Sequence, residues 1–399
     1  MEWKKYSVED QFINLTGVLS VFLCFLSFYL HSFLIFFIAV FLLLFLFSNS
    51  FYLKHVGKRL YLENKKVRNR FFPEETGDWI LAFENKGFPI MKGNLRIYFD
   101  DQVAPLEGFG DKRLTKYEVN IPVSLNYNQK TQIKIPFKTI RRGVAKIRLI
   151  ELHIPHLFGL GETVLEYKNI FMQEALVYPL PIPVKNKDLF LSGRPGESYV
   201  NISLYEDYLL PAGTRQYVFS DSFNRIHWKA SAKTNTLQTK IYDRVAETGW
   251  NLSLNIASGH AITSQAEGLI SSAAELAHYS AKHHIPFSLC INIRVAGSIP
   301  FYYIPPGTGS EQLQKVLEAL ALVDPYSSIY PYERMLSFYE RHMANQPFFI
   351  HGGNREGRAG KILQLFKKRG ISLLELNLEE EAGAVLTPLP FQFKDVVGQ

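Results

Sequence analysis

The stretch RIHWKASAKT, residues 225–234, concentrates the side chains of this sequence that could perform chemistry or bind a charged group. Within nine residues it holds Arg225, His227, Trp228, Lys229 and Lys233. Nucleophilic catalysis would need a hydroxyl or thiol beside a base, and only Ser231 and His227 could form such a pair, without a third group to orient them. The residue types therefore favour pairing with acidic groups, within the protein or on a partner, over catalysis, and we predict no catalytic residue.

Asp221 precedes this stretch and is expected to begin a short helix over about 222–233, because its carboxylate can accept hydrogen bonds from unpaired first-turn N–H groups. On such a helix Arg225, Lys229 and Lys233 follow Asp221 at i+4 spacing. Each of the two like-charge pairs costs about 0.2–0.5 kcal/mol in an isolated helix. The row therefore needs acidic company, and four acidic residues are near in sequence: Glu206, Asp207, Asp243 and Glu247.

Two interpretations of this charged row remain open. In the first, the charges form an internal salt-bridge clamp between a linker and the domain that follows, with Trp228 packed against the protein. In the second, the row is a surface that binds an acidic partner. The surroundings of Arg225 and Lys229 distinguish the two, because a clamp buries them against carboxylates and a binding surface exposes them to solvent.

A long apolar stretch near the N-terminus precedes the predicted folded domains and would determine where they lie in the cell. Residues 11–53 contain no Asp, Glu, Lys or Arg. A single helix of that length would run about 65 Å, twice the roughly 30 Å hydrocarbon core of a bilayer. Two passes, about 12–30 and 33–53, fit better, and no small-residue cleavage site of a secretory signal follows them. We predict a transmembrane helical hairpin over residues 1–55.

Basic residues flank this hairpin on both sides. Lys4 and Lys5 precede it. Seven cations follow it: Lys54, Lys58, Arg59, Lys65, Lys66, Arg68 and Arg70. Because positive flanks stay inside, both termini and the folded domains are expected in the cytoplasm. Residues 54–70 carry net +6 of the formal +7, which suits anionic lipid headgroups at about 1 kcal/mol per cation and gives nucleic-acid binding little support.

The rest of the chain divides according to the period of its apolar residues. From 56 to 185, alternating runs such as QIKIPF (132–137) predict an antiparallel β-sandwich-like domain. Residues 186–248, rich in Pro and Gly near their start, are expected to form a linker. From 249 to 399, strands alternate with helices, which predicts an α/β domain with a mostly parallel sheet. Its helices are expected near residues 265–284, 310–324 and 357–369. The predicted fold class is multi-domain.

Two sequence features could suggest a bound cofactor, but neither has the residues that such a site requires. Cys24 and Cys290 belong to different predicted domains, and both are expected to be reduced and structural. HGGNREGRAGK (351–361) lies between a strand and a helix, as a phosphate loop does. However, Arg355 and Ile362 replace the Gly and the hydroxyl residue that such a loop requires. We therefore predict no cofactor.

Three segments stand in a recognisable order and spacing. They are RRGVAKIRLIELHIPHLFGLGE (141–162), EALVYPLP (174–181) and RQYVFSDSFNRIHWKASAKTNTLQTKIYD (215–243). Together they resemble, over nearly the whole chain, a group of bacterial membrane proteins called the domain of unknown function 58 family, whose signature is R-x-Y-x-x-G-D…R-I-x-W-K-x-S-A. Ser220 replaces the family's Gly, and Gln216 replaces its usual Glu. The predicted binding residues of this signature segment are Arg215, Tyr217, Asp221, Arg225, His227, Trp228, Lys229 and Lys233.

The resemblance also implies that residues 249–399 form a von Willebrand factor A-like domain. Metal-binding domains of that type end their first strand with Asp-x-Ser-x-Ser, whose oxygens hold a divalent cation. This sequence has Asn255, Ala257 and Gly259 at the corresponding positions. Only one candidate ligand remains, as a neutral amide, so we predict no metal site.

Proteins of this family are discussed beside MoxR-type AAA+ ATPases, so the resemblance suggests such an ATPase as the protein partner. The expected function is that of a membrane-anchored cytoplasmic interaction or scaffold protein, acting in assembly or envelope-related processes. Two alternatives remain. One is an envelope-associated hydrolase with an unrecognised site, and the other is a sensor of anionic lipid surfaces that uses the basic segment 54–70.

Overall fold

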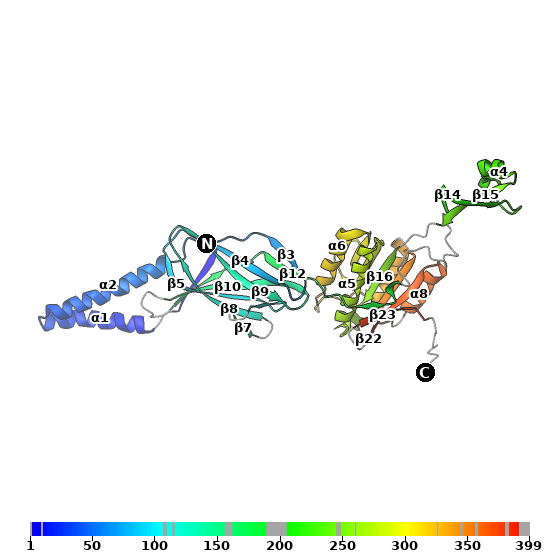
Figure 1. Ribbon diagram of the computed structural model, residues 1–399. Helices are drawn as coiled ribbons and strands as arrows, with labels where there is room; N and C mark the ends of the chain where they lie inside the picture. The colour runs from blue at the N-terminus through cyan, green and yellow to red at the C-terminus, as the bar shows by residue number, and fades with distance from the viewer. Residues whose placement is uncertain are drawn as a thin grey trace, which may run out of the picture. The chain divides into compact units, whose positions relative to one another are not determined.

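The computed structural model divides the chain into two compact units, Met1–Leu180 and Pro181–Gln399 (Figure 1). The described residues are 2–8, 11–106, 110–113, 116–155, 162–188, 206–244, 249–259, 261–324, 326–343, 346–355, 358–379 and 383–390. Beyond an N-terminal pair of helices, the first unit consists of strands, and a mixed sheet flanked by helices forms most of the second. The protein is therefore multi-domain and mostly β.

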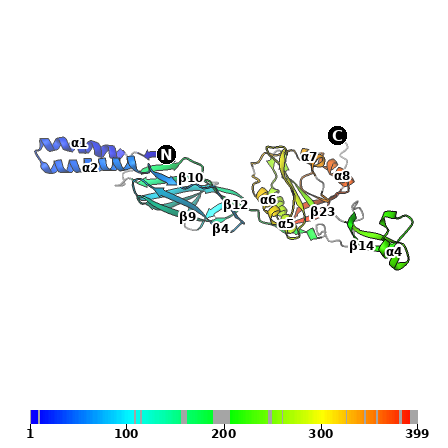
Figure 2. The same ribbon diagram turned by 90° about the horizontal axis from the view of Figure 1, so that it is seen from above.

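An apolar helical hairpin stands near the start of the first unit. Helices α1 (Gln11–Tyr29) and α2 (Phe33–His55) run antiparallel (Figures 1 and 2). The rings of Phe28 and Phe36 meet across their turn, 6.0 Å apart between centroids. Within the described residues, α2 is the one helix long and apolar enough to cross a membrane, and the apolar part of α1, Leu15–Tyr29, is shorter.

Two sheets form the rest of the first unit. The larger has the order β1-β11-β10-β5-β8-β7, with β12 paired to β10 and β3 paired to β12. Its strands are β1 (Trp3–Val8), β3 (Val67–Phe71), β5 (Ile90–Asp100), β7 (Gly110–Arg113), β8 (Lys116–Leu125), β10 (Gly143–Pro155), β11 (Glu162–Tyr167) and β12 (Gln173–Val177). The smaller has the order β2-β4-β9-β6. Its strands are β2 (Leu60–Leu62), β4 (Thr76–Asn85), β6 (Val103–Pro105) and β9 (Gln129–Thr139).

One apolar core joins the two sheets. Trp79 of β4 lies 4.9 Å from Phe137 of β9 and 6.5 Å from Phe99 of β5, between ring centroids, and all three side chains are buried. Alternate residues of these strands are buried because successive side chains of a strand point to opposite faces. The period-two pattern of the sequence thus supplies the inner faces of both sheets.

The helical hairpin leaves and re-enters this β-structure. β1 precedes α1 and pairs antiparallel with β11, from Trp3 opposite Tyr167 to Val8 opposite Glu162. β2 follows α2 and pairs with the end of β4, Leu60 opposite Asn85. The residues on both sides of the helices are therefore held by strands of the same unit.

The second unit contains a seven-stranded sheet of order β13-β23-β22-β21-β16-β19-β20. Its strands are β13 (Val184–Lys185), β16 (Trp250–Asn255), β19 (Phe287–Arg294), β20 (Phe301–Gly307), β21 (Phe348–Gly353), β22 (Ser372–Glu379) and β23 (Gly383–Pro388). The four strands β22, β21, β16 and β19 run parallel to one another, whereas β20 and β23 are antiparallel to their neighbours β19 and β22. A small ribbon, β17 (Ala257–Ser258) with β18 (Ala261–Ile262), follows β16.

Helices cover both faces of this sheet (Figure 2). They are α5 (Ala266–Lys282), α6 (Gly309–Ala321), α7 (Tyr332–His342) and α8 (Ala359–Lys368). Every residue of β16 is buried, as expected for a strand covered on both faces. On one face, Phe349 of β21 packs against Tyr339 of α7 and Phe366 of α8, at 5.6 and 4.9 Å between ring centroids.

Residues 206–244, which we call the signature hairpin, form an element within the stretch predicted to be a linker. It contains β14 (Glu206–Gln216), a 3-10 turn η1 (Phe223–Arg225), α4 (Trp228–Thr234) and β15 (Gln238–Arg244), and β14 pairs antiparallel with β15. The predicted continuous helix over 222–233 is wrong. Ile226 is extended, buried and bridged to Thr239 of β15, and this contact interrupts the helical path.

Candidate functional site

The carboxylate of Asp221 is the centre of the hydrogen bonds in the signature hairpin. Arg215 forms an ion pair with Oδ1, while the N–H of Val218 and the hydroxyl of Thr239 donate to Oδ2 at 3.1 and 3.0 Å. These donors favour the ionised form, so Arg215 first and Val218 next lower the pKa of Asp221. The hydroxyl of Tyr217 donates to the backbone oxygen of Asp221 at 3.3 Å. Asp221 thus joins β14 to β15 and does not cap α4.

His227 and Ser231 hold the start of α4 in place. Nδ1 of His227 accepts the N–H of Ala230 at 3.1 Å, as the cap of the helix. The Ser231 hydroxyl donates to the backbone oxygen of His227 at 3.1 Å and accepts the N–H of Gln238 at 2.8 Å. Since the serine proton goes to a carbonyl and the facing ring nitrogen is occupied, these side chains do not form a nucleophile–base pair.

The outer surface of the signature hairpin carries apolar rings and cations. Phe223 is 67% exposed and Trp228 is 59% exposed, and their rings meet edge to face at 5.6 Å between centroids. Lys229 and Lys233 are exposed, whereas Arg225 is half-buried. The acidic side chains expected beside this row, those of Glu206, Asp207, Asp243 and Glu247, lie outside the part of the structure that is described.

The seven cations that follow α2 are not gathered in one place. Three lie at or just after its last turn: Lys54, Lys58 and Arg59. Lys65 and Lys66 come next along the chain, before β3. Arg68 and Arg70 lie on β3, at the other end of the sheets from α2 (Figure 1). There Arg68 forms an ion pair with Glu174 of β12 at 2.7 Å.

At the carboxyl ends of the central strands of the second unit, polar side chains are enclosed and bonded to the chain. Asn255, the last residue of β16, donates through Nδ2 to the backbone oxygen of Asn354 at 2.7 Å. Its Oδ1 accepts from the N–H of Ala257 at 3.2 Å and from Nδ2 of Asn292 at 2.7 Å. Gly353 (φ 100°) passes so close that a Cβ there would lie 2.0 Å from the backbone oxygen of Asn255. No group of three or more His, Cys, Asp and Glu side chains among the described residues could hold a metal.

A second buried chain of hydrogen bonds runs beside the first. The Tyr332 hydroxyl lies 3.0 Å from Oγ of Ser253 and 2.6 Å from Nδ1 of His351, whose Nε2 lies 3.0 Å from the backbone oxygen of Gly353. Because a carbonyl only accepts, Nε2 carries the proton, Nδ1 accepts from Tyr332, and Ser253 donates to Tyr332. Burial, assisted by the charge of Arg355, lowers the pKa of His351 to about 3. The ring is therefore neutral and has a structural role.

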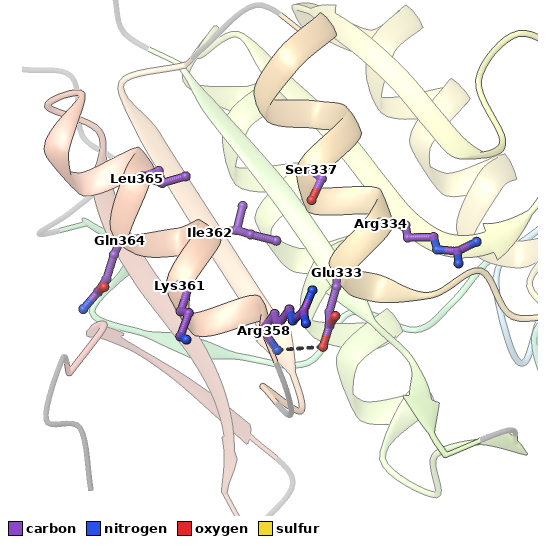
Figure 3. Close-up of a pocket in the computed structure, with 8 residues that line it drawn as sticks. All are labelled: Glu333, Arg334, Ser337, Arg358, Lys361, Ile362, Gln364 and Leu365. Atoms are coloured by element: carbon purple, nitrogen blue, oxygen red, sulfur yellow. Dashed lines mark hydrogen bonds between the residues drawn. The ribbon is translucent and has the colours of Figure 1, made fainter. Parts of the chain in front are cut away.

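An open groove of about 850 Å³ lies between α7 and α8 (Figure 3). Glu333 accepts the backbone N–H of Arg358 at 2.6 Å and so caps the start of α8. The cations Arg334, Arg358 and Lys361 are exposed along the groove, and Ile362 is half-buried in it. No ion pair to these three cations occurs among the described residues.

The sequence prediction contained no helix over residues 332–342, and so it gave no groove between α7 and α8. The apolar spacing of Tyr332, Met335, Leu336 and Tyr339, at i, i+3, i+4 and i+7, would have indicated that helix. In the sequence, Lys361 stands at the end of the stretch HGGNREGRAGK and gives no local sign of a groove. Its place beside a second helix depends on tertiary packing, which the local sequence does not contain.

A match to a known protein family includes most of the signature hairpin. Residues 213–342 match the family described as protein of unknown function DUF58. The DUF58 match begins in β14 and ends with α7, so it covers all the predicted signature residues but a smaller part of the chain than the resemblance did. No curated protein matches the sequence significantly.

Two solved structures show weak similarity. The CARDB domain of a Pyrococcus furiosus protein, in complex with di-metal ions, is 14% identical, covering 30% of this chain and 86% of that one, with a TM-score of 0.18. A putative membrane anchored protein from Corynebacterium diphtheriae is 11% identical, covering 32% of this chain and 35% of that one, with a TM-score of 0.20. The chain thus spans about a third of the second structure. Neither likeness bears on the function of the DUF58 segment.

Proposed function

We propose that this protein is a membrane-anchored interaction protein that binds an acidic protein partner through the signature hairpin. The supporting observation is that different side chains of the hairpin fix its backbone and form its surface. The bonds of Asp221 and His227 fix its backbone, while the rings of Phe223 and Trp228 and the nearby lysines remain at its surface. Trp is among the residue types that most often carry binding energy in protein interfaces, and exposed cations attract an acidic partner.

The partner class comes from the family resemblance, which suggests a MoxR-type AAA+ ATPase acting with this protein in assembly or envelope-related processes. The same resemblance motivates a von Willebrand factor A-like assignment for residues 249–399. The parallel strands β22, β21, β16 and β19 support that assignment, and Asn255 would then stand where metal-binding relatives have an acidic ligand.

The anchor is proposed to be two-pass, with α1 and α2 crossing the membrane and both termini and the folded units in the cytoplasm. Lys4 and Lys5 before α1, and Lys54, Lys58 and Arg59 at the end of α2, support this orientation. Protease added outside intact cells should leave a tag at residue 399 uncut. Cleavage of the tag would show that residue 399 lies outside the cell and would contradict the proposed orientation.

A binding measurement tests the hairpin surface. Full-length protein in detergent, immobilised, should capture a purified MoxR-type ATPase from the same cell. Replacing both hairpin lysines, Lys229→Glu with Lys233→Glu, should reduce capture at least tenfold, because each reversal adds repulsion to an acidic partner. The matched control is Lys282→Glu with Lys368→Glu, which changes net charge equally on α5 and α8.

The outcomes separate the parts of the proposal. Equal loss of capture in both variants would indicate general charge attraction and remove the hairpin as the specific surface. Absence of capture by the unmodified protein would remove this class of ATPase. If the hairpin variant unfolds at lower denaturant concentration and the control does not, the lysines belong to an internal clamp.

A further inference from the structure

The end of α2 is built into the β-structure without an intervening linker. The Tyr52 hydroxyl donates to the backbone oxygen of Pro89 at 3.1 Å, and Val56, directly after the helix, is completely buried in the core. The amino group of Lys5, from β1, donates to the backbone oxygens of Leu53 and Val56, at 3.1 Å for Val56. It thereby satisfies carbonyls that the last turn of a helix leaves unpaired.

The length of α2 sets the depth of this junction in a membrane. The 20 residues from Phe33 to Tyr52 span about 30 Å, the thickness of the hydrocarbon core. His55 then lies about 4.5 Å further along the axis, within a headgroup layer that is roughly 5–7 Å deep. The ring of Phe88, between β4 and β5, lies 5.7 Å from that of His55 and 5.9 Å from that of Phe51. The β4–β5 turn therefore falls at headgroup depth.

Neighbouring segments bring more apolar and basic side chains to the same end. The N–H of Asn128, in the β8–β9 turn, donates to the backbone oxygen of Asn85 at 2.7 Å, and β5 begins beside the end of β8. Met91 and Tyr127 are each 69% exposed and Phe88 is 40% exposed. Exposed cations near them along the chain and at the end of α2 include Lys54, Lys58, Arg59, Lys86, Lys92 and Lys130, of which Lys86 pairs with Glu84.

We propose that this end of the first unit is a lipid-contacting rim that lies among the membrane headgroups. The rim consists of Lys58, Arg59, Phe88, Met91, Lys92 and Tyr127. The inference rests on the proposed crossing by α2 and adds a contact made by the folded unit itself. Aromatic rings with a polar edge favour the interface, and lysine stems lie on apolar surface while their amino groups reach phosphates. A lipid surface is the occupant because the rim is continuous with α2 and lies within one headgroup depth of the hydrocarbon.

Fluorescence quenching by lipid tests the rim directly. Full-length protein with Cys24→Ala and either Met91→Cys or Tyr127→Cys is labelled with a fluorophore and reconstituted into phosphatidylcholine–phosphatidylglycerol vesicles. Cys290 is buried, so the introduced thiol takes the label. Thr76→Cys, at the opposite end of β4, is the control. Lipid spin-labelled in the headgroup should quench labels at 91 and 127 several-fold more than at 76, and equal quenching at the three positions would overturn the proposal.

Carbonate extraction of the same vesicles separates failure of the rim from failure of the anchor. Equal quenching in protein that resists extraction overturns the rim and leaves the anchored protein intact. Extraction of the protein removes the crossing by α2, and the rim with it. Replacing the two lysines, Lys58→Gln with Lys92→Gln, should reduce the gain in quenching that phosphatidylglycerol gives over phosphatidylcholine alone. An unchanged gain overturns the part assigned to the cations.

Discussion

The signature hairpin and the central sheet of the second unit differ in the side chains that they leave at the surface. In the hairpin, the carboxylate of Asp221 joins two strands, and the rings of Phe223 and Trp228 stay at the surface. In the sheet, the amide of Asn255 and the ring of His351 are enclosed and bonded to the chain. Polar bonds hold both regions, but the hairpin leaves apolar rings exposed, whereas the sheet encloses its polar side chains.

This difference indicates which of the two regions can bind another molecule. The amide of Asn255 has its donor and its acceptor engaged by neighbouring groups, so it offers no free ligand atom to a substrate or cation. In the hairpin, the polar side chains of Asp221 and His227 bond to the hairpin itself, whereas apolar and cationic side chains stay exposed. Substitutions in the sheet should therefore act on stability, and substitutions on the outer face of the hairpin should act on binding.

The largest expected effect is that of Asn255→Ala. The change leaves the backbone oxygen of Asn354, the N–H of Ala257 and Nδ2 of Asn292 without this partner. Of these groups only the Asn292 amide is fully buried, while water can reach the other two, so leaving that amide unsatisfied is expected to cost about 1–3 kcal/mol. Hydrogen exchange at the amides of β16 and β19 in the full-length protein would measure it.

The matched control for that change is Asn377→Ala in β22. Asn377 is exposed, and its Nδ2 donates to Oγ1 of Thr387 at 3.1 Å. Because water can replace this partner, its loss should cost about 0.5 kcal/mol or less. Equal effects of the two substitutions would show that enclosure of the polar network does not stabilise the sheet.

A pH dependence gives the next largest effect. The pKa of His351 is lowered to about 3 in the folded protein, while an unfolded histidine titrates near 6.5. Below about pH 6.5 the unfolded chain binds a proton that the folded chain does not, so stability falls by up to about 1.4 kcal/mol per pH unit. His351→Gln should lose this dependence between pH 6.5 and 5. His278, whose pKa burial also lowers, titrates in both proteins and cancels in the comparison.

The period of the apolar residues predicted those elements whose burial is visible locally. Helices expected near 265–284 and 310–324 occur as α5 and α6, with bounds Ala266–Lys282 and Gly309–Ala321. Each packs one face on the sheet, and the spacing of its apolar residues records that face. β1 was not predicted, because six residues before a long apolar stretch carry little signal and their partner β11 lies far along the chain.

The arrangement of the signature residues could be predicted only in part. Their identity as a polar cluster was visible in the sequence, but their contacts depend on the pairing of β14 with β15. Asp221 meets Arg215 and Thr239 because these strands are adjacent, and Ile226 leaves the helical path because it bridges to β15. A helical spacing of charges cannot reveal such cross-strand contacts.

The smallest expected effect on stability is that of the paired substitution Phe223→Ala with Trp228→Ala. Both rings are more than half exposed and contact each other, so their removal should change the unfolding free energy by about 0.5 kcal/mol or less. Capture of the proposed partner should nevertheless fall at least tenfold, because a Trp buried on binding often contributes strongly to affinity. Denaturant unfolding and the capture assay, applied to the same preparation, measure the two effects.

Asp221→Asn is expected to have the opposite pattern of effects: it should weaken the structure of the hairpin and leave both exposed rings in place. The amide cannot pair as a charge with Arg215, so the hydrogen bonds between β14 and β15 should weaken and amide exchange in 213–244 should accelerate, while both rings remain in the sequence. Since the pKa of Asp221 is lowered in the folded state, its stabilising effect is present above the unfolded value near 3.9 and is lost only as the pH falls below it. The Asn variant should therefore differ from the unmodified protein at pH 7 and converge with it in strong acid. If the ring substitutions accelerated exchange as much as Asp221→Asn does, the rings would be part of the hairpin's own packing, and the contrast with the sheet would disappear.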